Sequence, residues 1–412
     1  MIDLQHIQNL DATDPLAHKK AEFDLPSGCV YLDGNSLGAL PFAAKKRVAE
    51  VVSDQWGKDL IKSWNCHQWI DLPQKVGEKI APLIGAAPGQ VICCDSISVN
   101  LFKLLCSALA MQKGRNVVLS QGDNFPTDLY MVQGLQDLLG ETQCELRICA
   151  EEYIEQSLHS DVAVLLLTQV NFRSGQLHNM QRITKLAHRH GILVIWDLAH
   201  SAGALPVQLD DCQVDFAVGC GYKYLNGGPG APAFVYVASR HQQTVKQPLT
   251  GWMGHRQPFR FDPEYAAAEG VHQYLSGTPS IVAMSALDAA LEVFADINMH
   301  QVRTKSLLLA KLCLDLFAQY PALSALTLAS PMRNEERGSQ LAFAHPQAFA
   351  ICQALIAQNV ICDFRAPDIL RIGFTPLYTS YADVWLAVSR LNDVVENKVF
   401  KEVAYQQHSK VT

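Results

Sequence analysis

The sequence predicts an α/β protein with a mostly parallel central sheet wrapped by helices, followed by a smaller α+β domain. Three observations support this prediction. The chain has 412 residues, of which 49% are hydrophobic, so it can bury a large core. Between residues 91 and 237, short apolar runs alternate with segments of helical periodicity. Such alternation is typical of a parallel sheet covered on both faces, and beyond residue 280 the pattern changes.

The N-terminal part combines a polar stretch, a loop and a helix. Residues 1–26 are polar and weakly periodic, and a short strand is expected at residues 31–32. The glycine-punctuated residues 33–38 (Asp-Gly-Asn-Ser-Leu-Gly) are interpreted as a turn, or as a loop that lines a site. The proline that opens residues 41–56 favours a helix there. Residues 61–72 are rich in aromatic side chains, which indicates a core or interface role, or a wall for a flat substrate.

The alternation of strands and helices begins near residue 91. Short apolar runs predict strands at residues 91–94, 117–119, 145–149, 162–167, 192–197, 216–218 and 234–237. The periodic segments between them predict helices at residues 101–111, 128–139, 154–158 and 180–190. In sheets of this kind, ligands bind at the carboxyl ends of the strands.

The C-terminal part has longer helices. Its periodicity predicts helices at residues 281–297, 302–320, 346–358 and 380–397, and strands at residues 340–344 and 369–374. We therefore expect an N-terminal segment at residues 1–50, a large ligand-binding domain at residues 51–280 and a small α+β domain at residues 281–412.

Composition excludes several classes of protein. The formal net charge of −7 argues against a nucleic-acid or anionic-membrane binder. The first twenty residues lack the apolar core of a signal peptide, and the longest apolar runs are far too short to cross a bilayer. The 12 cysteines form no C-x-x-C motif and mostly sit in apolar runs, as expected of reduced thiols in the cytoplasm.

Two candidate binding features follow early strands of the predicted sheet. Residues 96–98 (Ser-Ile-Ser) open a helix, where hydroxyls and free backbone N–H groups suit a phosphate; an ordinary N-cap serine is the alternative. Residues 124–128 (Asn-Phe-Pro-Thr-Asp) follow the next strand, and the proline fixes the loop that carries Phe125. Phe125 is interpreted as a stacking ring for a heteroaromatic ligand or as a plain core residue.

Two further features follow later strands. Asp197 comes after an apolar strand, where a carboxylate needs a cationic partner, and His200 follows three residues later. This pair is compatible with a metal site, a hydrolytic dyad or a carboxylate that holds a protonated pyridine. Lys223 lies between glycines at 219 and 221 and the Gly-Gly-Pro-Gly run at 227–230, immediately after a buried strand. Burial favours a neutral amine, which can form a Schiff base with a carbonyl.

Together, a phosphate site, a stacking aromatic ring, a buried carboxylate and an enclosed lysine match the needs of pyridoxal 5'-phosphate. The carboxylate keeps the pyridine protonated, so that the ring takes up electrons, and the lysine carries the aldehyde. A metal-dependent hydrolase would leave Lys223 unexplained and lacks further ligands at suitable spacing. A non-catalytic binding protein would not need the combination of Lys223, Asp197 and Arg371.

The sequence resembles the fold-type I pyridoxal phosphate enzymes, and among them it is similar to the kynureninases over nearly its whole length. The motifs that carry the resemblance are residues 34–38, 99–101, 124–128, 197–203, 222–230, 251–255 and 370–373. The lysine segment followed by Gly-Trp-Met-Gly-His at residues 251–255 is the part most specific to the kynureninases.

The resemblance implies a set of cofactor-binding residues, namely Ile97, Ser98, Phe125, Asp128, Asp197, His200, Tyr222, Lys223, Trp252 and Thr278. Within this set, Lys223 is expected to carry the cofactor, Phe125 to stack on its ring and Asp197 to pair with its pyridinium nitrogen. Ile97, Ser98, Tyr222, Trp252 and Thr278 are expected around the phosphate. The last two are expected to reach across from the other subunit of a homodimer.

The resemblance also implies substrate contacts and a reaction. Ser36, Trp64 and Arg371 are the expected substrate-binding residues, and the planar guanidinium of Arg371 suits a carboxylate. Some relatives carry histidine where this chain has Trp64, which leaves the preferred ring substituent open. The implied reaction is hydrolysis of L-kynurenine, with its 3-hydroxy derivative as a second candidate substrate and Lys223 and Tyr222 as the catalytic residues.

The nearest alternative is another enzyme of the same fold, a cysteine desulfurase or a class V aminotransferase. A desulfurase needs a nucleophilic cysteine on a mobile loop in its C-terminal third. The candidate loop here, residues 330–340, contains no cysteine. The sequence therefore favours the prediction of a kynureninase over that of a cysteine desulfurase.

Overall fold

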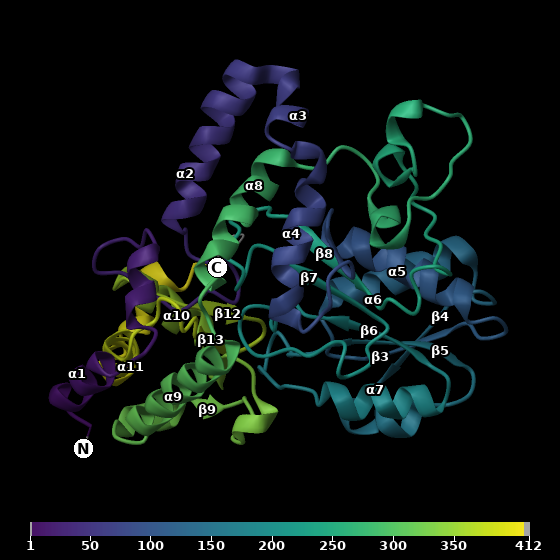
Figure 1. Cartoon of the computed structure of the whole chain (residues 1–412). Coiled ribbons are helices and arrows are strands. Elements are labelled where there is room, and N and C mark those ends of the chain that lie inside the picture. The colour runs from purple at the N-terminus through teal and green to yellow at the C-terminus, as the bar shows by residue number, and fades with distance from the viewer. Residues whose placement is uncertain (1, 408–412) are drawn as a thin grey trace.

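The computed structural model describes residues 2–407 and contains a large central sheet beside a smaller one (Figure 1). The large sheet has seven strands in the order β2-β8-β7-β6-β5-β3-β4. They are β2 Val91–Cys93, β3 Val117–Gln121, β4 Glu145–Cys149, β5 Val162–Thr168, β6 Leu193–Asp197, β7 Phe216–Cys220 and β8 Ala233–Val237. The pairs among β3 to β7 are parallel, whereas β8 is antiparallel to both β7 and β2. The mostly parallel sheet that the sequence predicts is confirmed.

Helices bury both faces of the large sheet because alternate strand residues point to opposite sides. One face packs against α4 Leu72–Ile80, α7 Met180–Arg189 and α8 Ile281–Ala290. The other packs against α5 Ile97–Met111 and α6 Pro126–Leu139. All seven residues of β5 are buried, as its unbroken apolar run requires of a central strand.

The smaller sheet is antiparallel and has the order β12-β13-β10-β9. Its strands are β9 Thr327–Leu328, β10 Gln340–Ala344, β12 Asp363–Arg365 and β13 Ile369–Gly373. It shares a core with α9 Met299–Phe317, α10 Ala348–Ala357 and α11 Tyr381–Glu396, and also with α1 Leu4–Ala12 through Ile7. In addition, β1 Val30–Tyr31 pairs in parallel with β11 Val360–Ile361. The N-terminal residues therefore pack against the C-terminal part of the chain.

The helix predicted at residues 154–158 is wrong, because the chain there forms only the short 3-10 turns Glu151–Tyr153 and Glu155–Ser157. The helix predicted at residues 281–297 is α8 Ile281–Ala290, followed by a 3-10 turn at Leu291–Phe294.

Two further helix boundaries differ from the sequence prediction for local reasons. The helix predicted at residues 41–56 is α2 Phe42–Glu50, which continues in wider π-helical turns over Val51–Asp59. Leu60 then ends it with a positive φ of 53°. The helix predicted from residue 101 begins at Ile97, because the side chain of Ser96 caps it by accepting a hydrogen bond from the Val99 N–H. A short helix, α3 Ser63–Cys66, follows the π-helical segment.

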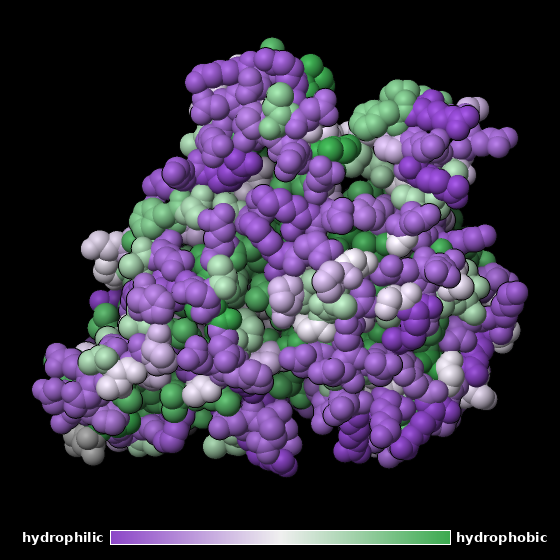
Figure 2. Space-filling model, in the orientation of Figure 1, coloured by the Kyte–Doolittle hydropathy of each residue, from purple (hydrophilic) through white to green (hydrophobic). Residues whose placement is uncertain are grey.

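The surface in Figure 2 is mostly hydrophilic, with apolar residues on the two protrusions at the top of the view. Exposed Val52, Trp56, Leu60 and Ile61 belong to the segment that follows α2. Exposed Phe259 and Phe261 belong to the loop region between β8 and α8. Within residues 2–407, no helix combines the length and apolar character needed to cross a membrane.

A buried ion cluster lies at the amino end of β7. The carboxylate of Asp215 is 2% exposed and accepts hydrogen bonds from His188, His241, Arg240 and the Val194 N–H at 2.7–2.8 Å. Burial alone would raise the pKa of Asp215, but the hydrogen bonds from the two histidines outweigh burial and lower it well below the ordinary value. This cluster ties the ends of β6 and β7 to the segment after β8.

We expect Asp215→Ala to lower the free energy of unfolding by about 1–3 kcal/mol at pH 7, because it leaves the buried Val194 N–H and three partly exposed side-chain donors without their acceptor. A depressed pKa in the folded state means that the carboxylate stabilises the fold above the unfolded pKa of about 4 and loses this effect as the pH falls further. Urea unfolding should therefore show a difference that shrinks in acid. Exposed Asp211→Ala is the matched control. Equal losses of unfolding free energy in the two variants would contradict a stabilising role for the Asp215 cluster.

Candidate active site

A cavity of about 270 Å³ lies where β2, β6 and β7 end. Predicted site residues that line it are Ile97, Ser98, Phe125, Asp197, His200, Tyr222 and Lys223. Larger hollows of about 1040 Å³ and 690 Å³ open elsewhere on the surface, but their walls include none of these residues. The carboxyl ends of parallel strands therefore gather the predicted groups, as expected for this type of sheet.

Lys223 lies in the turn after β7 and reaches the cavity with its amine. Its Nζ is 2.9 Å from Nε2 of His200 and 5.7 Å from the centroid of the Phe125 ring. Burial is the main cause that lowers the pKa of Lys223 below the ordinary value for lysine. The Gly38 N–H donates to the Tyr222 carbonyl at 2.8 Å, and a Cβ at Gly38 would collide with the Lys223 backbone. The loop at residues 33–38 therefore holds the lysine turn by close backbone contact.

Asp197 and Asp128 form a buried carboxyl pair beneath the cavity. Asp197 ends β6, and its Oδ1 accepts a hydrogen bond from the Ala199 N–H at 2.7 Å. Burial raises the pKa of Asp197 to about 6, although the charge of Lys223 opposes this rise. Burial, and then the charge of Asp197, raises the pKa of Asp128 well above its ordinary value. The contact between the two carboxyls raises the pKa of Asp128 and lowers that of Asp197, so Asp128 is the one that holds a proton more readily.

The start of α5 forms one end of the cavity. Ser96 is the N-cap, and Ile97 and Ser98 occupy the first turn, which has free backbone N–H groups. The helix dipole adds partial positive charge at this end, so the geometry suits an anion such as a phosphate. The N-cap and the anion-site interpretations of this segment are compatible, because one serine caps the helix while the next residues face the cavity.

Phe125 presents an aromatic ring at the cavity wall. It precedes Pro126, the first residue of α6, and it is 38% exposed. The ring of Phe172 packs against it edge to face, with centroids 5.3 Å apart and an interplanar angle of 85°. This contact fixes the ring orientation and leaves a surface on which a flat ligand can stack.

His200 and Tyr222 flank Lys223 and keep defined protonation states. Burial, and then the charge of Lys223, lowers the pKa of His200 well below its ordinary value, so its ring is neutral. Within the described chain, the buried Nδ1 of His200 has no hydrogen-bond partner. Burial also raises the pKa of Tyr222, so its hydroxyl keeps its proton at neutral pH. The cavity thus offers one neutral ring and one available phenolic proton beside the lysine.

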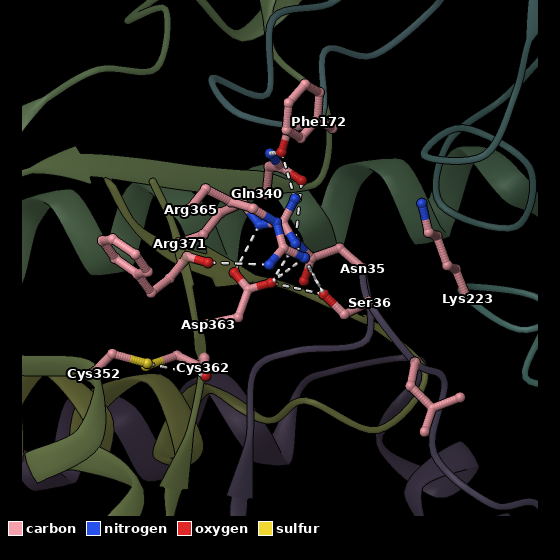
Figure 3. Close-up of polar contacts among 12 residues, drawn as sticks. Asn35, Ser36, Phe172, Lys223, Gln340, Cys352, Cys362, Asp363, Arg365 and Arg371 are labelled. Carbon is pink, nitrogen blue, oxygen red and sulfur yellow. Dashed lines mark hydrogen bonds and ion pairs between the residues drawn. The ribbon is translucent and has the colours of Figure 1, made fainter. Parts of the chain in front are cut away.

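Ser36 and Arg371 belong to a second group beside the cavity (Figure 3). Arg371 on β13 makes a two-pronged ion pair with Asp363 on β12, and its Nη2 donates to Ser36 Oγ at 2.9 Å. In the close-up, Asn35 and Ser36 lie on the side of Arg371 and Asp363 that faces Lys223. Both groups thus meet the loop at residues 33–38, which joins the two parts of the site.

Trp64, Trp252 and Thr278 do not line the cavity within residues 2–407. The rings of Trp64 and Trp252 instead pack edge to face against each other, with centroids 6.5 Å apart. Thr278 is exposed to solvent. The sequence prediction that Trp252 and Thr278 act in the site of a second subunit stays a prediction.

Sequence reasoning missed two parts of the site. The hydroxyl of Thr168, the last residue of β5, bonds to Asn124 and lies 3.2 Å from Asp128 Oδ2. A polar residue at the end of a fully apolar strand is the signal that could have found it. Arg365 and Asp363 were missed because β12 has only three residues, and so short a strand shows no alternation that would indicate which side chains face the site.

The comparisons with known proteins agree on one family. Residues 302–391 match the family model described as the kynureninase C-terminal domain. The chain is 49% identical to the kynureninase of Deinococcus radiodurans over 404 residues, which cover 96% of this chain and 97% of that one. It is 45% identical to the kynureninase of Pseudomonas fluorescens over 407 residues, which cover 98% of both chains.

Solved structures with lower sequence identity share the fold. A variant of C-DES with glycine covalently linked to its PLP cofactor superposes with a TM-score of 0.80 at 16% identity, covering 91% of this chain and 99% of that one. The cysteine desulfurase CsdA from Escherichia coli gives 0.77 at 19% identity, covering 93% and 98%. With near-complete coverage and identities far above those of its fold relatives, the chain belongs to the kynureninase family.

Proposed function

We propose that this protein uses pyridoxal 5'-phosphate to hydrolyse L-kynurenine to anthranilate and L-alanine. The observation that carries the proposal is the cavity in which Lys223, His200 and Asp197 converge beside the start of α5. Full-length relatives named kynureninase support the choice of reaction. The absence of a cysteine from residues 330–340 argues against a desulfurase.

The residues of the cavity fit this cofactor. Asp197 is a buried carboxylate that needs a cationic partner, which a protonated pyridine nitrogen would supply. Ile97 and Ser98 at the start of α5, with Tyr222, would hold the phosphate. Phe125 would stack on the ring, Asp128 would support Asp197, and Lys223 would hold the aldehyde carbon. Trp252 and Thr278 of a second subunit would complete the phosphate site.

When bound, pyridoxal phosphate supplies an aldehyde for the substrate amine and a ring that takes up electrons from the α-carbon. Arg371 would bind the substrate carboxylate, and Ser36 and Trp64 are proposed to contact the aromatic part of the substrate. In this chain by itself, Ser36 bonds to Arg371, and Trp64 packs against Trp252 outside the cavity. The amine of Lys223 accepts the α-proton, and neutral His200 at 2.9 Å keeps this amine oriented. Lysine thus serves as anchor first and as proton carrier second.

Tyr222 supplies the proton that completes the products. Water adds to the γ-carbonyl carbon, and the Cβ–Cγ bond then breaks with its electron pair on Cβ. The phenol of Tyr222, whose pKa burial raises, is a protonated group beside Lys223 and donates to this carbon. One water is consumed, and anthranilate and alanine are released.

The proposal is tested by release of fluorescent anthranilate from L-kynurenine by the purified protein loaded with pyridoxal phosphate. The expected result is steady turnover with an equal amount of alanine. Sulfide or alanine formed from cysteine, without turnover of kynurenine, would instead assign the protein to the desulfurases. Running the same assay with 3-hydroxykynurenine measures the preference for the ring substituent, which Trp64 is proposed to influence.

We expect Tyr222→Phe to lower kcat by about 10²-fold or more with a small change in KM, because it removes the proposed donor and keeps the ring. The visible spectrum of the bound cofactor should persist. Tyr130→Phe, at an exposed position on α6, is the matched control. A Tyr222→Phe variant with wild-type kcat would remove the hydroxyl from the mechanism.

The proposed setting is a cytoplasmic homodimer that acts in tryptophan and kynurenine metabolism, with a contribution to NAD biosynthesis. The exposed apolar residues Trp56, Ile61, Phe259 and Phe261 support the dimer, since such side chains are usually covered. Light scattering of the purified protein tests it. The division at residues 50 and 280 also remains a proposal, and α8, which begins at the second boundary, packs with the large core.

A further inference from the structure

The cluster beside the lysine cavity contains two guanidinium groups and one carboxylate that pairs with both. Asp363 and Arg371 are direct cross-strand partners, and Arg365 lies two residues after Asp363 on the same face of β12. Nη2 of Arg365 is 2.7 Å from Asp363 Oδ2. Ser36 Oγ donates to Asp363 at 2.7 Å and accepts from Arg365 at 3.0 Å and from Arg371 at 2.9 Å. Figure 3 shows these side chains converging on one point.

Arg371 has little capacity left for a ligand in this arrangement. Its side chain is 1% exposed, and its Nε and Nη2 both donate to Asp363. Nη2 donates also to Ser36, and Nη1 to the Phe172 carbonyl. Because a guanidinium has five N–H groups, one hydrogen of Nη1 remains. Arg371 alone therefore cannot grip a carboxylate with two bonds unless it releases a present partner.

Arg365 is the more available of the two cations. Its side chain is 31% exposed. Within the described chain, its hydrogen bonds are those of Nη2 to Ser36 and Nη1 to the Phe364 carbonyl, together with the ion pair to Asp363. Its Nε–H and a second Nη1 hydrogen have no partner there. A ligand oxygen can therefore reach Arg365 without disturbing Asp363.

The charges of the cluster are unbalanced in favour of an anion. Burial raises the pKa of Asp363, but the charge of Arg371 and then that of Arg365 lower it overall, so Asp363 is ionised. Burial, and then the charge of Asp363, raises the pKa of nearby Asp33 to about 7, so Asp33 is partly neutral. Two guanidiniums thus face one full negative charge. Their excess charge also acts on Lys223 and His200, which lie in the adjoining cavity.

We propose that Arg365 is a second carboxylate-binding residue of the substrate site, and that Asp363 is the positioning residue that holds both guanidiniums side by side. One carboxylate oxygen of the substrate accepts from the unpartnered Nη1 hydrogen of Arg365, and the other accepts from the remaining Nη1 hydrogen of Arg371. This assignment rests on the proposed function, because it takes the ligand to be an α-amino acid bound at Lys223.

The test compares two amines that differ by the carboxylate, L-alanine and ethylamine, on the protein loaded with pyridoxal phosphate. Binding of each is followed by the change in the visible absorbance of the cofactor, so no turnover is needed. Arg365→Gln should weaken L-alanine about 10- to 100-fold, the loss expected for a hydrogen bond to a charged group, and leave ethylamine within about twofold. Arg365→Lys should recover part of the loss, since it keeps the positive charge but not the fixed direction of the guanidinium N–H group.

Kinetics provides the second readout and separates the two proposals. KM for L-kynurenine should rise by a similar factor in Arg365→Gln, with kcat within about threefold of wild type. Exposed Arg182→Gln on α7 is the matched control. Equal weakening of L-alanine and ethylamine, or unchanged L-alanine binding in a variant with the wild-type melting temperature, would overturn the role of Arg365. Failure of the wild type to hydrolyse kynurenine while L-alanine binding depends on Arg365 would refute the proposed reaction alone.

Discussion

Lys223→Ala is expected to lower kcat for kynurenine hydrolysis by about 10⁴-fold or more, because the variant loses both the covalent anchor and the proton carrier. The visible absorption of the lysine-bound cofactor should disappear as well. The amine of Lys223 lies in the cavity beside neutral His200, and burial lowers the pKa of this amine. Within residues 2–407, no other lysine lines the cavity, so no second amine can replace it. The measurements are single-turnover release of anthranilate and the absorption spectrum.

Addition of a small primary amine, such as methylamine, should restore part of the activity of Lys223→Ala by replacing the missing base. Exposed Lys185→Ala on α7 is the matched control and should behave as wild type. Turnover near the wild-type rate in Lys223→Ala, without added amine, would contradict the central role of the lysine.

Asp197→Asn is expected to lower kcat by about 10²- to 10³-fold, because an amide cannot stabilise the positive charge that the ring nitrogen needs in the transition state. The neutral amide keeps the size of the side chain, so the fold should persist. Burial also sets a pH dependence for the wild type. With a pKa of about 6, the Asp197 carboxyl of the cofactor-free protein becomes protonated as the pH falls below that value.

Affinity of the cofactor-free protein for pyridoxal phosphate should accordingly fall as the pH drops through about 6, and Asp197→Asn should lack this dependence. The direction of the Asp197 pKa shift can also be tested through the pH dependence of the free energy of unfolding. A carboxyl whose pKa is raised by folding stabilises the protein below the unfolded pKa and loses this contribution as the pH rises through the folded value. Cofactor-free Asp197→Asn should therefore gain stability over wild type above pH 6. Identical pH profiles for the two proteins would exclude Asp197 as the titrating group.

Local sequence patterns predicted long elements with a regular burial pattern better than short edge strands. The apolar run of β5 is a strong signal because the strand is buried on both faces, and the periodicity of α7 is strong because one face of that helix packs against the core. In contrast, β9 and β12 have two and three residues, so neither shows a period. The π-helical continuation of α2 was missed because local propensity does not distinguish it from an α-helix.

The sequence by itself determined which chemical groups stand at the ends of the strands. Lys223, Asp197 and Phe125 each follow a buried apolar run, and parallel strands bring such ends to one edge of a sheet. The order of strands and helices was enough for that placement, because chain direction fixes which end of each strand carries the loop.

Tertiary structure alone decided the protonation states and the carboxylate-binding group. Burial and mutual contact raise the pKa of Asp128 above its ordinary value, and no local sequence pattern records that Asp128 lies beside Asp197. Ser36 bonds to Arg371 although 335 residues separate them. The contact forms because the loop at residues 33–38 packs between the lysine turn of the large sheet and strand β13 of the small sheet. Burial and long-range contact depend on the whole fold, so the partners of Lys223 were readable from the sequence while the charges they carry were not.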